Sequence, residues 1–190
     1  TTDPSAHGRA IDFWRQRQKV GIKDMDLVAI MDPDCVLLSE WWRKEVDRVM
    51  AEENPGNVGI WGAGSQEDFG PRVHASMMVI RGKLFNNLDR SFIPCLDPRE
   101  RTWRDTGGLY CMWAKDAGWR VVSVERAVDW IGFSAWVVPT NNGATYAWTH
   151  LGGGSHSDPT RMTPWQRIKR WRAVQRRERF KRFVRAHLAQ

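Results

Sequence analysis

Two aspartates, Asp32 and Asp34, directly follow the largely apolar run DLVAIM at 26–31, and only Pro33 separates them. Carboxylates this close repel each other, and their ionised forms need a cation or hydrogen-bond donors nearby. Hard divalent ions such as Mg²⁺ and Mn²⁺ prefer oxygen ligands and commonly bridge the phosphates of a substrate. The pair therefore predicts a metal–diphosphate site, and the alternative interpretation is a solvated turn that carries two acids.

The elements around this pair predict where it lies in the fold. The run 26–31 is typical of a central strand covered on both faces, and Ser39 stands at the N-cap position of a helix from 40 to about 53. In α/β sheets, ligands bind beyond the carboxyl ends of the strands. Asp32 and Asp34 are therefore predicted to lie at such an end.

Alternating strands and helices continue along the chain. Apolar periodicity and glycine or proline stops predict helices at 6–21, 82–88 and 106–118, and strands at 58–64, 74–81 and 119–125. Residues 145–156 form an apolar stretch that runs into a glycine loop. This order favours an α/β fold, an α/β/α sandwich with a mainly parallel sheet.

Composition limits the class of protein. A hydrophobic content of 42% and a charged content of 27% fit a globular protein. Its longest apolar runs fall far short of the roughly 20 residues that a membrane-spanning helix needs. The first ten residues are polar and show no signal-peptide pattern. Three widely spaced cysteines form no CxxC pair, which argues against a zinc site or disulfide framework and favours a cytoplasmic location.

The net charge of +7 is concentrated at the C-terminal end. Residues 165–190 hold ten Lys or Arg and one Glu, a net +9, so the rest of the chain carries −2. We expect a core at 1–160 and a basic amphipathic helix at 161–190. Its apolar stripe either packs on the body with the arginines solvated, or the helix lies on an anionic membrane surface, peripheral at the inner face. Nucleic acid is not expected as a partner, because the body offers no second basic face.

Four stretches resemble, in the right order, the glycosyltransferases of family 2 and related families with a GT-A fold. Residues 26–50, DLVAIMDPDCVLLSEWWRKEVDRVM, resemble the Asp-x-Asp strand and the helix after it. The supporting stretches are SAHGRAIDF at 5–13, HASMMVIRGKLF at 74–85 and RDTGGLYCMWAKDAGWRVVSVE at 104–125. The resemblance covers roughly residues 5–156, and it implies a GT-A-like (Rossmann-like) fold.

It also implies a reaction, the inverting transfer of a hexose from a nucleotide-sugar donor to a hydroxyl of a saccharide or lipid-linked acceptor. Asp34 is implied to bind a Mn²⁺ or Mg²⁺ cofactor that holds the diphosphate, with Asp32 on the ribose, the metal or a metal-bound water. His150 is implied to be a further metal ligand, with His156 as the alternative. Asp105 is implied to be the general base that deprotonates the acceptor, although its place before a helix fits an N-cap equally well.

The remaining implied site residues are predicted to bind substrate. Ser5, His7 and Gly8 are implied to lie near the sugar diphosphate, and Gly107 and Gly108 complete the substrate-binding set. His7 and His74 are interpreted as structural and not as metal ligands, although His7 sits beside a glycine where a phosphate could lie.

The resemblance leaves two questions open. About 25 residues precede the Asp-x-Asp strand, whereas GT-A domains normally place two strand–helix units for the nucleotide base ahead of the helix that corresponds to 5–13. The nucleotide-binding half is therefore expected to be incomplete: the chain is a fragment, another chain completes the site, or the pocket is reduced.

The competing functions are a phosphohydrolase of the haloacid dehalogenase type and a non-catalytic fragment that binds anionic surfaces.

Overall fold

The structure is a computed structural model. It describes residues 6–18, 21–51, 57–64, 73–87, 90–93, 95–96, 103–104, 106–130, 133–151 and 164–188. Five helices occur in this part of the chain: α1 (Ala6–Gln18), α2 (Trp41–Ala51), α3 (Gly82–Asn87), α4 (Gly108–Asp116) and α5 (Pro164–Leu188). The ten strands are β1 (Leu27–Met31), β2 (Cys35–Leu37), β3 (Val58–Gly64), β4 (Val73–Arg81), β5 (Cys95–Leu96), β6 (Trp103–Arg104), β7 (Arg120–Val124), β8 (Arg126–Trp130), β9 (Phe133–Thr140) and β10 (Gly143–His150).

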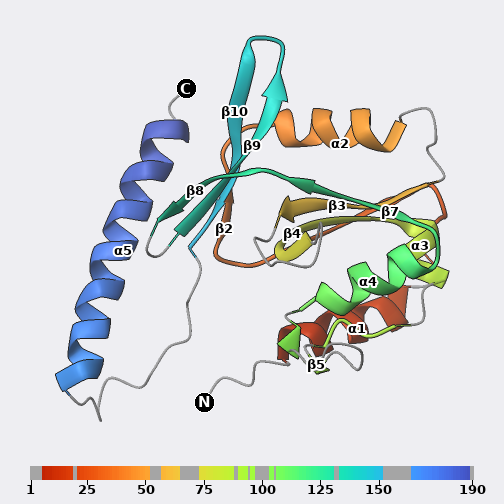
Figure 1. Cartoon of the computed structure of the whole chain (residues 1–190), viewed down its shortest axis with the longest axis horizontal. Helices are drawn as coiled ribbons and strands as arrows, with labels where there is room; N and C mark the ends of the chain where they lie inside the picture. The colour runs from red at the N-terminus through yellow and green to blue at the C-terminus, as the bar shows by residue number, and fades with distance from the viewer. Residues whose placement is uncertain are drawn as a thin grey trace.

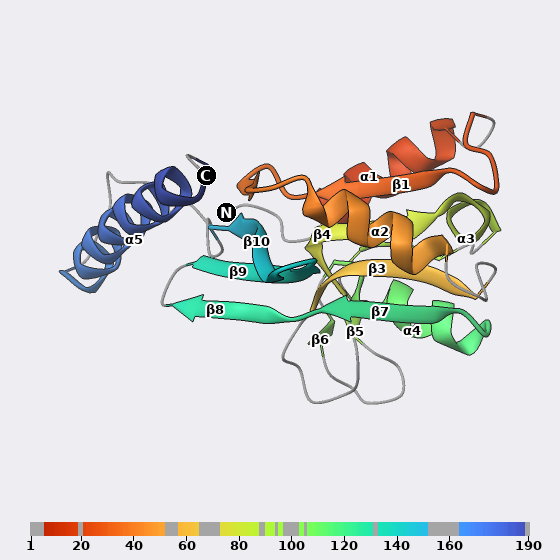
Figure 2. The same ribbon diagram turned by 90° about the horizontal axis from the view of Figure 1, so that it is seen from above.

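Two four-stranded sheets organise the chain, in the orders β1-β4-β3-β7 and β2-β10-β9-β8, and β5 and β6 form a separate pair. One face of the first sheet packs against α1, α3 and α4 around a first hydrophobic core. The other face packs against α2 and the second sheet around a second core that contains Trp61, Trp136 and Trp148 (Figures 1 and 2). The predicted α/β class is therefore confirmed.

The predicted mainly parallel sheet is wrong for the described residues, since only β3 and β7 pair in parallel. The β1–β4 and β3–β4 pairs are antiparallel, as are all pairs of the second sheet. Parallel neighbours need a crossover connection of roughly a dozen or more residues. Only residues 65–72 separate β3 from β4, and β7 to β10 follow one another with no helix between them. The mixed topology follows from these short connections.

All four shorter helices occur where the sequence predicted them, within two to three residues at each end. Gly118 adopts a φ of 84° after α4, as expected for a helix that stops at a left-handed residue. The predicted strands at 26–31, 58–64, 74–81 and 119–125 are also present. Strands β2, β8 and β9 were not predicted, and the apolar stretch at 145–156 was not assigned as the strand β10 that it forms in part. Strands β5 and β6 lie where the sequence predicted a loop.

Strand β1 lies at the edge of the first sheet, because no described strand pairs with its other side. Val28 and Ile30 are buried in the first core, whereas Leu27 and Met31 are 39% and 42% exposed. The continuous apolar run predicted a strand covered on both faces, and among the described residues it is covered on one.

Candidate metal centre

A tight turn carries the two aspartates at the end of β1. The amide of Cys35 donates to the carbonyl of Asp32 at 3.0 Å, which closes a turn with Pro33 in its second position. Proline fixes φ near the value that this position requires. The amide of Asp32 also donates to the carbonyl of Ser76 at 3.3 Å, so the β1–β4 ladder continues into the turn. The backbone of Asp32 is therefore held by both the turn and β4.

Strand β10 brings His150 to this turn from far along the chain. In the β2–β10 pair, His150 lies opposite Cys35, and the amide of Leu151 donates to the carbonyl of Asp34 at 3.2 Å. His150 Nε2 lies 3.0 Å from Asp34 Oδ1 and 3.4 Å from Asp32 Oδ2. The predicted association of Asp32, Asp34 and His150 is thus present in the geometry.

These three side chains fit a divalent cation. One donor atom from each lies within 4.8 Å of the other two, and all three residues are partly buried; the described residues contain one such group. Neighbouring ligands about 2.1 Å from an octahedral ion stand roughly 3 Å apart, close to the two distances from His150. Two carboxylates and one imidazole suit Mg²⁺ or Mn²⁺, and the nitrogen favours Mn²⁺ of the two.

Two more histidines surround the group. His7, in the first turn of α1, places Nδ1 3.0 Å from Asp32 Oδ1, so each oxygen of Asp32 faces a different histidine. His74 Nδ1 accepts the amide of Ser76 at 3.0 Å, and its ring centroid lies 5.8 Å from that of His150. The sequence had indicated a structural role for His74. Its place beside the group follows from the β1–β4 pairing, which the sequence did not reveal.

The electrostatics of the group favour a positive charge between the acids. Burial raises the pKa of Asp32, but hydrogen bonds and charges from His150 and His7 outweigh it and hold the pKa below its usual value near 3.8. Burial lowers the pKa of His150, and the bonds and charges of Asp32 and Asp34 reverse this, leaving the pKa above 6.5. Asp32 and Asp34 therefore favour a positive charge at His150, as they would favour a cation between them.

The neighbouring thiol is not a nucleophile. Burial first, and then the charges of Asp32 and Asp34, raise the pKa of Cys35 to about 12. A thiol attacks as its thiolate. Cys35 therefore stays protonated at neutral pH and acts as a small packing residue of the second core.

The predicted glycines are packing positions in the described structure. A Cβ at Gly8 would lie 2.6 Å from backbone atoms of Phe92 and Ile93, so glycine allows α1 to approach this segment closely. Gly107 has a φ of 80°, and a Cβ there would lie 2.7 Å from Met78 Cε. Gly108, the first residue of α4, is buried. None of these three observations involves the metal group directly.

Other predicted residues have different outcomes. Ser5, Asp105 and His156 lie outside the described residues. The N-cap of α4 is Gly107, so the interpretation of Asp105 as the N-cap of this helix is wrong. The reason is that α4 begins at Gly108, two residues later than predicted.

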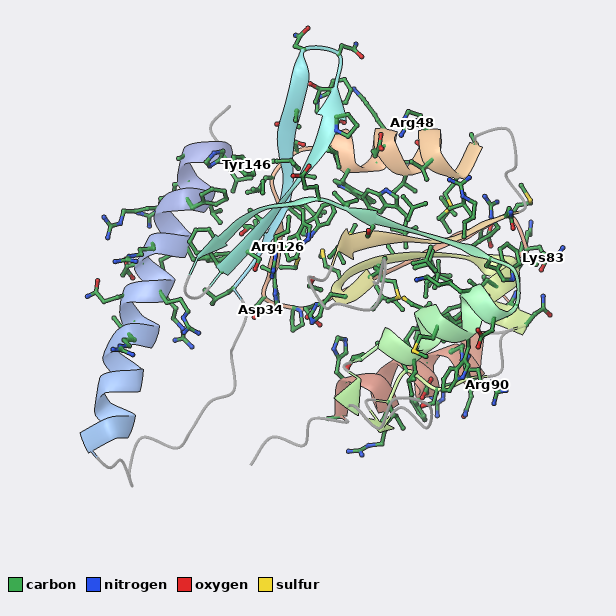
Figure 3. The ribbon with its side chains drawn as sticks, viewed as in Figure 1. Asp34, Arg48, Lys83, Arg90, Arg126 and Tyr146 are labelled. Carbon is green, nitrogen blue, oxygen red and sulfur yellow. The ribbon has the colours of Figure 1, made fainter. Side chains whose placement is uncertain are left out.

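Two helices begin at the end of the sheet that holds the group. In Figure 1, α1 and α4 both start on the side where β1 ends, and Figure 3 shows Asp34 on this side. Helix N-termini carry a partial positive charge and unpaired N–H groups, which favour anions such as phosphate. The arrangement therefore suits a cation together with an anionic ligand.

No family model matches the chain, and neither a curated protein nor a solved structure matches it significantly. Helices long and apolar enough to cross a membrane are also absent from the described residues. Function must therefore be inferred from the chemistry of the group itself.

Proposed function

We propose that this chain is a GT-A-like glycosyltransferase that moves a hexose from a nucleoside-diphosphate sugar to an acceptor hydroxyl. The observation that supports this most is the convergence of Asp32, Asp34 and His150 at the end of β1. An apolar strand, an Asp-Pro-Asp turn and a helix follow one another as they do in the family that the sequence resembles. A saccharide or a lipid-linked saccharide is the proposed acceptor.

The proposed roles follow from the contacts of each residue. Asp32, Asp34 and His150 would hold Mn²⁺ or Mg²⁺, which offsets the negative charge that develops on the departing nucleoside diphosphate. His7 orients Asp32 through its other oxygen. The N-terminal amides of α1 and α4 face the side where the diphosphate would lie. Asp105 remains the proposed base for the acceptor hydroxyl, and direct attack by that acceptor would invert the anomeric configuration.

Calorimetry with the full chain tests the proposal. We expect uridine or guanosine diphosphate to bind when Mn²⁺ is present and to lose this binding when the metal is chelated. Asp34→Ala should abolish metal-dependent binding, because it removes one of three ligands. Asp47→Ala, which removes an exposed carboxylate on α2, is the matched control and should leave binding unchanged. Nucleotide binding that persists in Asp34→Ala would contradict the proposal.

A phosphohydrolase of the haloacid dehalogenase type is less well supported. That fold needs a small hydroxyl residue soon after the second acid, whereas Cys35, Val36 and Leu37 follow Asp34 here. Both oxygens of Asp32 also contact histidines, and its side chain is 14% exposed. Hydrolysis of p-nitrophenyl phosphate with Mg²⁺ separates the two functions. Turnover that depends on Asp32 and needs no sugar nucleotide would favour the phosphohydrolase.

A further inference from the structure

The ring contacts that the structure describes between α5 and the rest of the protein lie on one face of the helix. The ring of Phe183 lies 5.1 Å from those of both Phe133 and Tyr146, on the second sheet. His187 contacts Tyr146 at 4.8 Å and Phe180 contacts Phe133 at 6.0 Å, both edge to face. These residues follow one another in steps of three and four, so they lie along one side of the helix. This side is already occupied by the sheet.

The remaining surface of α5 is strongly basic. The exposed basic residues on its described part are Arg172, Arg177, Arg179, Lys181, Arg182 and Arg185. Glu178 is the only acid from 165 to 190, and it pairs within the helix with Lys181 at 2.9 Å. Most of the positive charge of the helix is therefore not neutralised by acidic residues of the segment 165–190.

Two exposed apolar side chains lie among these cations. Val174 and Leu188 are 49% and 56% exposed. With Lys181 and Arg185 between them, the spacings are seven, four and three residues, which place all four on the same side of the helix. The helical spacing of the sequence places Val174 and Leu188 on the apolar stripe, for which packing on the body was one of the two alternatives. In the structure they lie on the outer face of α5. Apolar side chains on a helix face that contacts only water add no stability to the protein.

The position and charge of α5 select the kind of partner. Figures 1 and 2 place α5 at the outside of the molecule, beyond the end of the first sheet where β1 and the metal group lie. The other residues of the chain carry a net charge of −2, which disfavours the extended phosphate contacts that a nucleic acid needs. A flat anionic surface needs contact with only one face of one helix.

We propose that the outer face of α5 binds the anionic surface of a lipid membrane and holds the end of the molecule with the metal group toward it. The attachment is electrostatic, with shallow contacts from Val174 and Leu188, because the aromatic face is occupied by the second sheet. This inference goes beyond the proposed transferase function and does not rest on it. Membrane attachment and metal-dependent nucleotide binding use different residues, so either can fail alone.

Vesicle co-sedimentation of the full chain tests the proposal. We expect binding to vesicles of phosphatidylcholine mixed with phosphatidylserine, and none to vesicles of phosphatidylcholine alone. Replacing Lys181, Arg182 and Arg185 together by glutamine should weaken binding roughly 100-fold, given the usual contribution of a basic residue near an anionic surface. Raising the salt concentration should weaken it as well.

The matched control removes three exposed positive charges elsewhere. Lys23 lies between α1 and β1, Lys83 on α3 and Arg120 on β7. Lys83 stands at the opposite end of the molecule from α5 (Figure 3). Their joint replacement by glutamine should leave vesicle binding within a few-fold of the parent, because these charges are outside the proposed surface. Circular dichroism of both variants confirms that they fold.

Three outcomes would overturn the proposal. In the first, the parent chain remains in the supernatant with anionic vesicles at low salt. In the second, both triple variants lose binding equally, which indicates that the net charge of the protein, and not the outer face of α5, causes the binding. The third is that a duplex or single-stranded oligonucleotide binds more tightly than the vesicles and depends on the α5 residues, which would make the face a nucleic-acid surface.

Discussion

At the scale of single residues, His150 is the group whose protonation matters most. It lies between Asp32 and Asp34, and their bonds and charges raise its pKa above the usual value near 6.5 despite burial. A metal ion and a proton compete for the same ring nitrogen. The stability of the metal-free chain and its affinity for metal must therefore change in opposite directions with pH.

The first prediction follows from this competition. In the metal-free chain, the stabilisation from protonated His150 is fully present below its unfolded pKa and is lost as pH rises through the raised folded pKa. Thermal unfolding in the presence of a chelator should show a melting temperature that falls with pH from about pH 6 upward. His150→Gln should remove this part of the pH dependence. Mn²⁺ affinity of the parent should rise over the same range, and a pH-independent affinity would contradict the role of His150 as a ligand.

The residues of the group differ in how far the sequence revealed them. Asp32 and Asp34 could be predicted because an apolar run that ends on two acids is a local pattern. His150 was found through resemblance, since its partners lie more than a hundred positions earlier in the chain. The contacts of His7 with Asp32 and of His74 with His150 depend on tertiary packing, for which neither residue carries a local signal.

At the scale of elements, Arg81 connects a helix end to a strand. Its guanidinium donates from Nη2 to the carbonyl of Met50 at 2.8 Å and from Nε to that of Val58 at 3.1 Å. Met50 lies in the last turn of α2, where carbonyls lack partners within the helix. Arg81 is 4% exposed, and burial lowers its pKa while the guanidinium stays charged. It thereby fixes α2 to the first sheet.

The second prediction concerns this connection. Arg81→Met keeps much of the packing volume but leaves two buried carbonyls without their donor. We expect a loss of roughly 3 kcal/mol in the free energy of unfolding, measured by urea denaturation. Lys83→Met, two positions away and exposed, should change it by less than about 0.5 kcal/mol. Equal effects of the two substitutions would show that the hydrogen bonds of Arg81 contribute little.

The elements that were predicted and those that were missed differ in pattern. The helices have periodic apolar residues, and some have a local boundary signal, such as Ser39 before α2 or Gly118 after α4. Strand β2 has three residues. The turn signals near β9 are Gly132 and Asn141-Asn142-Gly143, which separate one strand from the next and not a strand from a helix. The direction of pairing was not predicted either, because it depends on which strands become neighbours, as when β1 pairs with β4.

At the scale of the whole molecule, charge is divided between two parts. The body is slightly acidic and carries the metal group, whereas α5 carries the excess of basic residues. The aromatic contacts with Phe133 and Tyr146 join the two parts. The division was evident from the sequence, but the assignment of Val174 and Leu188 to the outer face of α5 was not.

The edge position of β1 has a consequence for the backbone amides of the metal-bearing strand. The amide of Asp32 donates to β4, and the carbonyl of Asp26 accepts from Gly82 on the same side. Backbone groups alternate in direction along a strand. The amides of Val28 and Ile30 therefore point toward β4, and those of Ala29 and Met31 point toward the open side.

The third prediction is an alternating pattern of hydrogen exchange along β1. Amides bonded inside a sheet exchange only when the structure opens, whereas unpaired edge amides exchange freely. In ¹H–¹⁵N spectra recorded after transfer to D₂O, Val28 and Ile30 should keep their signals long after those of Ala29 and Met31 have vanished. Equal protection of all four would mean that another segment pairs with this edge in solution. Strand β1, which ends at the two aspartates of the metal group, is thus held by hydrogen bonds to β4 on one side. The exchange rates of its amides measure how stable these hydrogen bonds are.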